Sequence, residues 1–190
     1  RITRQTGLEV ETEYYVNDMG IQMQILSQSV KARVQELRGE SGTPFPENGY
    51  KGGYISDIAK DMIAQNRDDF DVYPRTAILD GIRDDLKTFR VEFTSWFAES
   101  NLHERKKVEE ALAVLESHKA LKELDGALWF VAPDETEEDG KEPDKDRVLR
   151  KSDGRYTYFA SDIAYHKEKM ERGYDRCLDV WGHDHHGYVP

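Results

Sequence analysis

The chain is poor in cysteine and in long apolar runs. Cys177 is the only cysteine among 190 residues. A single cysteine excludes an internal disulfide and favours a reducing compartment, so we expect a cytoplasmic protein. The apolar runs are a few residues long, whereas a transmembrane helix needs about 20, so we expect no membrane partner. The opening residues, RITRQTGLEV, contain no signal-peptide core.

Positive charge is also scarce. The chain has 27 Lys and Arg against 38 Asp and Glu, a formal net charge of −11 at pH 7. This charge argues against nonspecific nucleic-acid binding by the whole surface. Residues 133–146 hold many acidic side chains and almost nothing apolar, so we predict a mobile hairpin loop there. The G-x-G-x-x-G, Walker lysine and G-x-S-x-G motifs are all missing.

Hydrophobic spacing separates helices from strands along the rest of the chain. Helical spacing predicts helices over 20–38, 54–66, 76–88 and from Ser100 or Asn101 to about 118. Alternation and β-formers predict strands over 8–16, 91–97, 127–132 and 147–152, the last two as a pair. The predicted chain has a strand and a helix at each end, and a segment of mixed helices and strands between them. This order predicts an α/β fold whose parallel sheet core is interrupted by an α+β insertion domain.

The C-terminal segment Cys177–Pro190, CLDVWGHDHHGYVP, joins an apolar run to a burst of His and Asp. We predict that CLDVW is a buried strand, which makes Cys177 a structural thiol rather than a nucleophile. The run His183–His186 suggests two alternatives, a zinc site or polar groups facing a ligand crevice at the strand's carboxyl end. Adjacent residues of an extended chain point to opposite sides, and no Cys pair lies nearby. We therefore favour the crevice and expect no bound metal.

A second polar segment is YTYFASDIAYH, residues 156–166. We predict a strand over 156–160, in which Tyr158 lies near the end, and a helix capped by Ser161 that ends at Gly173. Asp162 then falls in the first helical turn, where the helix dipole favours an ionised carboxylate. A carboxylate beside a phenol suits a guanidinium, because the acid accepts two parallel N–H bonds. The alternative is an ordinary helix-stabilising aspartate.

The third segment is EYYVNDMGIQ, residues 13–22. Asn17 and Asp18 follow a strand, and Gly20 starts a helix. A turn with a helix cap explains this pattern without any ligand.

Together and in this order, the three segments resemble the catalytic domain of bacterial arginyl-tRNA synthetases. YVNDMGIQ is similar to the segment after that domain's first helix, and FPENGYKGGYISDIAK is similar to the start of its inserted domain. DKDRVLRKSDGRYTYFASDIAYH and DVWGHDHHGYVP are similar to the return into the nucleotide-binding fold. The resemblance runs from about residue 5 to the end and is weakest near 67–125.

The resemblance implies a class I ligase with a Rossmann-type core. Residues 1–27 would form the first part of that core, 28–125 the inserted domain, and 126–190 a β-hairpin and the return into the core. The implied reaction joins arginine to ATP as arginyl-adenylate and passes arginine to tRNA(Arg), with Mg²⁺ accompanying ATP. The anticodon-binding part of such an enzyme is expected as a further partner within the same protein.

The resemblance also assigns residues to the substrates. Its arginine-binding residues would be Tyr158, Asp162 and His185, and its ATP side would include Gly182, Asp184 and His186. The family's turn after the first strand matches Asn17, Asp18, Gly20 and Gln22, to which no catalytic step is assigned. His183 stands where many relatives have a small residue.

The HIGH-type signature and the KMSKS-like loop of this family do not occur in the 190 residues. We therefore expect a fragment of an arginine–tRNA ligase that contains no catalytic residue of its own. The alternative is an autonomous, non-catalytic module that binds a cationic small molecule or RNA. A non-enzymatic acidic interaction protein is a weaker third candidate.

Because both signatures stabilise the transferring phosphoryl group, the 190-residue polypeptide alone should not catalyse arginine-dependent exchange between pyrophosphate and ATP. The exchange assay is run on pure polypeptide with and without tRNA. Exchange that disappears in the Asp162→Ala variant would contradict this expectation.

Overall fold

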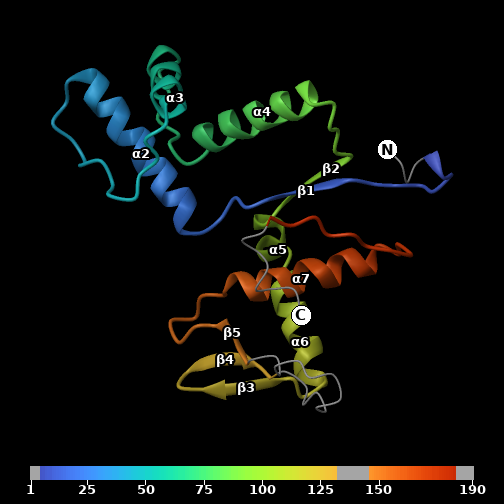
Figure 1. Cartoon of the computed structure of the whole chain (residues 1–190). Coiled ribbons are helices and arrows are strands. Elements are labelled where there is room, and N and C mark those ends of the chain that lie inside the picture. Colours follow the sequence, from blue (N-terminus) through green and yellow to red (C-terminus); the bar gives the residue numbers. More distant parts are fainter. Residues whose placement is uncertain (1–4, 132–145, 183–190) are drawn as a thin grey trace. The chain divides into compact units, whose positions relative to one another are not determined.

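The computed structural model describes residues 5–131 and 146–182 (Figure 1). The chain divides into two compact units, with the boundary between Ser100 and Asn101. No helix within the described ranges combines the length and the apolarity that crossing a bilayer requires. The predicted mobile loop 133–146 lies, except for its last residue, outside these ranges.

The first unit contains a two-stranded parallel sheet. Strand β1 (Glu13–Val16) pairs with β2 (Ser95–Ala98), although some 80 residues separate them in sequence. Aromatic rings reinforce the pair, because Tyr14 stacks on Trp96 with ring centroids 4.6 Å apart. We expected the C-terminal segment to be part of the same parallel sheet as β1. The neighbour that the structure gives β1 is instead β2, which lies inside the predicted insertion 28–125.

Three helices fill the sequence between β1 and β2 (Figure 1). They are α2 (Ile21–Arg38), α3 (Gly53–Ala64) and α4 (Tyr73–Thr88). The predicted helices over 20–38, 54–66 and 76–88 are thus confirmed within a few residues. A buried cluster joins α2 to α3, and α4 packs at its side through Tyr73, Ala77 and Ile78. The cluster consists of Leu26, Val30, Val34, Ile55, Ile58, Ala59 and Met62.

Asp18 ties the ends of the two parallel strands together. Its side chain is 6% exposed and forms an ion pair with Arg75 on α4, at 3.1 Å. Ser100, just after β2, donates to the same carboxylate twice, from its backbone nitrogen at 2.9 Å and from its hydroxyl at 2.8 Å. One carboxylate therefore holds the β1–α2 turn, the end of β2 and α4.

The second unit begins with two short helices rather than the single helix predicted to about residue 118. Helix α5 (Ser100–Glu104) starts at the boundary, and α6 (Lys107–Ser117) follows. Lys106 between them has a φ of 56°, in the left-handed region that a continuous right-handed helix cannot contain. The break lets Leu102 and Val108 both become fully buried.

An antiparallel sheet of three strands follows, in the order β3–β4–β5. The strands are β3 (Leu121–Leu124), β4 (Ala127–Phe130) and β5 (Arg147–Arg150). The predicted pairing of 127–132 with 147–152 is confirmed by β4 and β5. Strand β3 was not predicted, although Asp125-Gly126 is a favoured hairpin dipeptide and both residues have positive φ.

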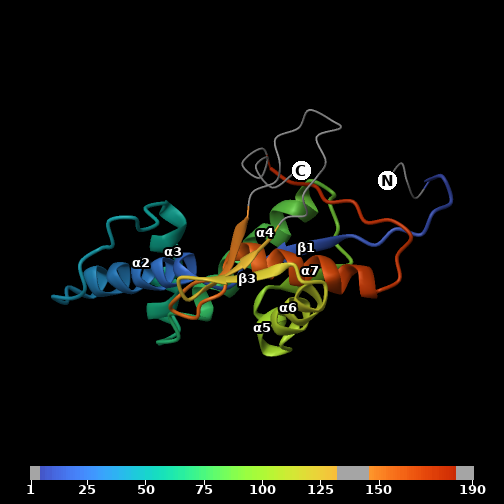
Figure 2. The same cartoon turned by 90° about the horizontal axis from the view of Figure 1, so that it is seen from below.

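Helix α7 (Tyr158–Glu171) closes the described fold and packs on α6 and β5 (Figure 2). The predicted strand over 156–160 is wrong. Only Tyr156 forms a bridge, to Arg150, and Tyr158 is the first residue of the helix. Ser161 is not the cap but a buried residue inside the helix, where its hydroxyl lies 3.4 Å from Nε2 of His103.

The segment 177–182 is neither strand nor helix, so the predicted buried strand CLDVW is wrong for this structure. Leu178 and Val180 are 90% and 89% exposed, and the Cys177 thiol is exposed rather than buried. An extended segment becomes a strand only when its backbone pairs with a neighbour. The described residues offer this segment no such strand.

The Asp18 contacts generate a prediction about stability. Asp18→Ala should lower the free energy of unfolding of the chain by about 2–3 kcal/mol, because it leaves Arg75 and two Ser100 donors without their shared acceptor. Urea unfolding followed by circular dichroism measures this loss.

Asp80→Ala is the matched control, since Asp80 is 60% exposed and pairs with Arg83 on the surface of the same unit. It should cost no more than about 0.5 kcal/mol. Equal losses for the two variants would contradict the role given to Asp18.

Candidate functional site

The start of α7 fixes the position of every polar residue on that helix. Thr157 is the N-cap, and its hydroxyl oxygen accepts from the backbone nitrogen of Ala160 at 3.4 Å. The same hydroxyl donates to the carbonyl of Val148 on β5 at 2.7 Å. The sheet therefore sets both where the helix begins and how it is rotated.

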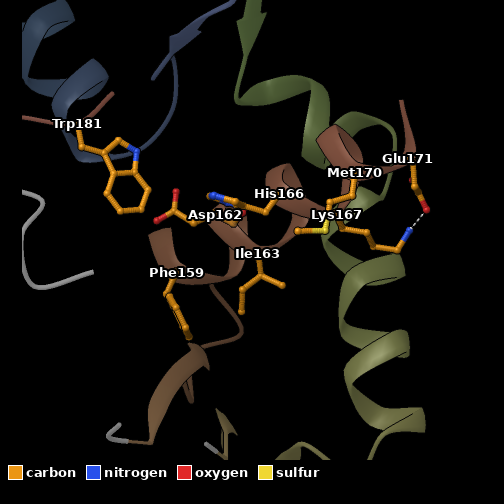
Figure 3. Close-up of a pocket in the computed structure, with 8 residues that line it drawn as sticks. All are labelled: Phe159, Asp162, Ile163, His166, Lys167, Met170, Glu171 and Trp181. Atoms are coloured by element: carbon orange, nitrogen blue, oxygen red, sulfur yellow. Dashed lines mark hydrogen bonds and ion pairs between the residues drawn. The ribbon is translucent and has the colours of Figure 1, made fainter. Parts of the chain in front are cut away.

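One face of α7 lines a cavity of about 600 Å³ (Figure 3). Seven of its lining residues belong to the helix and one to the segment that follows. The lining residues are Phe159, Asp162, Ile163, His166, Lys167, Met170, Glu171 and Trp181. Their spacing of three and four residues is that of a single helical face.

Asp162 supplies a carboxylate to this cavity. It was predicted in the first turn of its helix, but because α7 begins at Tyr158 it lies in the second, and no acidic residue occupies the first turn. The dipole argument for its charge therefore weakens, since the effect falls off within one turn. Its orientation agrees with a ligand-binding role, because Figure 3 shows the carboxylate pointing toward the indole of Trp181.

Tyr158 precedes Asp162 by four residues, so the two side chains emerge from the same side of α7. Tyr158 is 51% exposed and does not line the cavity itself. The structure thus brings two of the three predicted arginine-binding residues onto one helical face. The third, His185, lies outside the described residues.

A polar link joins the helix to the segment 177–182. Nε2 of His166 lies 3.3 Å from a carboxylate oxygen of Asp179, and Nδ1 of the same ring lies 2.8 Å from the backbone carbonyl of Asp162. Lys169 donates to the other carboxylate oxygen of Asp179. Neither His166 nor Asp179 was singled out from sequence, although His166 stands four residues after Asp162, a spacing that could have revealed it.

Burial, hydrogen bonding and charge compete at Asp179. Burial raises the pKa of its carboxyl group. The hydrogen bond and charge of Lys169, together with those of His166, lower the same pKa by more than burial raises it, so the net shift is downward. Asp179 therefore keeps its charge, and its hold on α7, to a lower pH than an ordinary aspartate.

The predicted turn after the first strand is present in the first unit. Gly20 is the N-cap of α2 with a φ of 82°, a conformation that suits glycine. Gln22 accepts a hydrogen bond from the Tyr50 hydroxyl at 2.7 Å. Asn17 borders a second cavity of about 360 Å³ between β1, α2 and α4, where Tyr14 and Arg75 are among its neighbours. The contacts of Asp18 with Arg75 and Ser100, and the positive φ of Gly20, give both residues structural roles.

Sequence reasoning missed a buried carboxylate beside this turn. Glu99 directly follows β2 and is 4% exposed. With its amide nitrogen turned toward acceptors, Asn17 donates to Glu99 Oε2 and to the Met19 carbonyl, both at 3.2 Å. No local pattern in the sequence ranks Glu99 above other acidic residues, because its partner Asn17 lies about 80 positions away, after β1.

The remaining predicted residues belong to the C-terminal segment. Gly182 is exposed and is the last residue described. The run His183–His186, which includes Asp184, lies outside the described residues. The choice between a ligand crevice and a metal at this run stays a prediction.

Comparison with known proteins finds similar sequences among bacterial ligases. No protein-family model matches it. It is 49% identical over 201 residues to the arginine–tRNA ligase of Desulfovibrio desulfuricans and 46% identical over 196 residues to that of Oceanobacillus iheyensis. These matches cover 100% and 97% of the chain. The chain is a homologue of bacterial arginine–tRNA ligases.

The matched stretch of these ligases is limited. The chain spans about a third of their length, 35% and 34% for the two relatives. The crystal structure of an arginyl-tRNA synthetase from Campylobacter jejuni superposes with a TM-score of 0.85 at 34% identity, covering 99% of this chain and 42% of that one. The arginyl-tRNA synthetase of Plasmodium falciparum shares the fold at a TM-score of 0.55 and 14% identity, over 88% of this chain and 29% of that one. The predicted family resemblance is confirmed, and so is the mixed α/β fold.

The link at Asp179 predicts a pH dependence. A carboxyl group whose folded-state pKa lies below its unfolded value, about 3.9, stabilises the fold at every pH above that value and loses the effect as the pH falls through the folded pKa. The contact between Asp179 and α7 should therefore persist down to about pH 4 and weaken only below it.

Lys169→Met should raise the pKa of Asp179, because it removes the main group that lowers it. Side-chain carboxyl NMR during an acid titration measures the shift. Lys122→Met, at an exposed lysine on β3, is the control and should leave Asp179 unchanged. An Asp179 pKa that is the same with and without Lys169 would refute the assigned cause.

Proposed function

We propose that this chain is part of a longer arginine–tRNA ligase and that it supplies the arginine-binding pocket of that enzyme. The supporting observation is the carboxylate of Asp162 in a cavity of about 600 Å³ whose surface is largely apolar. The similarity to arginine–tRNA ligases supports arginine as the substrate of this pocket.

Each part of arginine has a suitable partner among these residues. The guanidinium needs an acceptor for two parallel N–H bonds, which the Asp162 carboxylate offers. The three methylene groups of the side chain need apolar contacts, which Phe159, Ile163 and Met170 offer along the same face. The Tyr158 hydroxyl, one turn earlier, can accept or position a further N–H, and we propose that His185 joins the pocket from the C-terminal segment.

The rest of the reaction belongs to the proposed complete enzyme. There, arginine reacts with ATP, accompanied by Mg²⁺, to form arginyl-adenylate, and arginine is then transferred to tRNA(Arg). We propose that Gly182, Asp184 and His186 face the ATP side of a Rossmann-type core. We also propose that the segments 1–27 and 126–190 belong to this core, that 28–125 is its insertion, and that the enzyme is cytoplasmic.

Substitutions at the pocket test the proposal in the complete enzyme. Asp162→Asn keeps the size of the side chain and removes its charge, so arginine binding should weaken by about 2–5 kcal/mol while ATP binding changes little. Tyr158→Phe removes one hydroxyl and keeps the ring, so it should cost about 1–2 kcal/mol. The KM values for arginine and for ATP in the aminoacylation reaction measure the contrast.

Asp153→Asn is the matched control, because Asp153 pairs with Arg155 in an exposed turn that does not border the cavity. It should leave both KM values unchanged. Equal losses for arginine and ATP in the Asp162→Asn enzyme, or no loss for either, would count against the proposed pocket.

A further inference from the structure

The indole of Trp181 is the one part of segment 177–182 that borders the cavity on α7. Its apolar neighbours Leu178 and Val180 are almost fully exposed, so their burial does not hold the segment in place. The polar contacts of Asp179, two residues before Trp181, do so instead.

Asp179 holds the segment through two side chains on α7. The backbone carbonyl of Asp162 can only accept, so His166 donates to it from Nδ1 and turns its other nitrogen, Nε2, to Asp179. Lys169 binds the second carboxylate oxygen of Asp179 while its ammonium lies 4.6 Å from the centre of the Tyr165 ring. The helix turn that carries Asp162 is thus connected to Asp179, two residues before Trp181.

The indole packs against this link. The rings of His166 and Trp181 meet edge to face, with centroids 6.3 Å apart and planes at 77°. Figure 3 shows the Asp162 carboxylate pointing toward the indole, with Phe159 and Ile163 below it. A carboxylate and an aromatic face thus border the same cavity.

We propose that Trp181 is a specificity-determining residue of the arginine pocket, where the guanidinium binds between its indole and the Asp162 carboxylate, and that Asp179 is the residue that positions it. This inference rests on the proposed function. A guanidinium is planar and weakly hydrated, so it stacks on an aromatic face while its edge pairs with a carboxylate. The ammonium of lysine is compact and strongly hydrated, and it gains less from the same surface.

The two lysines of α7 nearest the cavity have carboxylate partners of their own. Lys167 forms an ion pair with Glu171 one turn along the helix, and Lys169 is bound to Asp179. Both ammonium groups are therefore engaged with other carboxylates. The two ring nitrogens of His166 contact the Asp162 carbonyl and the Asp179 carboxylate.

Substitutions of Trp181 in the complete enzyme test the stacking. Trp181→Leu removes the aromatic face but keeps an apolar side chain, so the KM for arginine should rise roughly 5- to 30-fold and the preference for arginine over lysine should fall by a similar factor. Trp181→Phe keeps a smaller ring and should raise that KM only roughly 2- to 4-fold. The KM for ATP should stay the same in both variants.

Substitutions of Asp179 test the positioning. Asp179→Asn should raise the KM for arginine roughly 3- to 10-fold with a smaller effect on kcat, and Asp179→Glu should recover part of the loss. Glu168→Gln is the control, because it breaks an ion pair with Arg172 on the same helix without touching the cavity. Equal effects of Asp179→Asn and Glu168→Gln on arginine would overturn the positioning role.

The Asp162→Asn enzyme separates this inference from the proposed function. If Asp162→Asn weakens arginine binding while Trp181→Leu and Trp181→Phe do not, the role of Trp181 is wrong and the arginine pocket stands. If Asp162→Asn also leaves arginine binding unchanged, the pocket itself is wrong. A graded loss from tryptophan to phenylalanine to leucine, confined to arginine, is the result we expect.

Discussion

The hydroxyl of Thr157 is the contact on which the geometry of the cavity depends. It caps α7 and at the same time donates to the Val148 carbonyl on β5, so the sheet determines the residue at which the helix starts. A start at a different residue would turn the helix by about 100° per position and move Asp162 and His166 off the cavity face. The site is therefore built by a hairpin that contributes no side chain to the cavity.

Hydrophobic spacing was sufficient to predict the elements whose burial is local. Helix α3 buries Ile55, Ile58 and Met62 at intervals of three and four, as the sequence predicted. Helix α2 was predicted as a helix, but its buried face includes Leu26 and leaves Ile21 exposed. The start of α7 could not be predicted, because Thr157 and Ser161 are both acceptable caps, and only the position of β5 decides between them. The prediction of a strand for CLDVW was wrong for a related reason. Its residues favour a strand, but a strand also needs a neighbouring strand to pair with, and the composition of the segment says nothing of that neighbour.

Polar residues, too, could be predicted where the pattern is local and could not where it depends on contacts between elements. Asp162 could be selected because an aspartate near a helix start beside a tyrosine is a local pattern, and the cavity that it lines agrees with that selection. Glu99 and Asp179 could not be ranked in this way, because their partners, Asn17 and His166, lie on other elements. A spacing of four from Asp162 pointed to His166, yet nothing in the sequence indicated that it would meet Asp179.

The exposed thiol of Cys177 has a practical consequence. It is the only cysteine among the 190 residues, it is accessible, and it lies four residues before Trp181. A maleimide dye would therefore attach to this polypeptide at a single position without any engineering, on the segment that borders the cavity. Its emission would report directly on whether that segment rests against α7 or has moved away. The same accessibility allows two copies to become covalently joined in air, so a reductant belongs in every preparation.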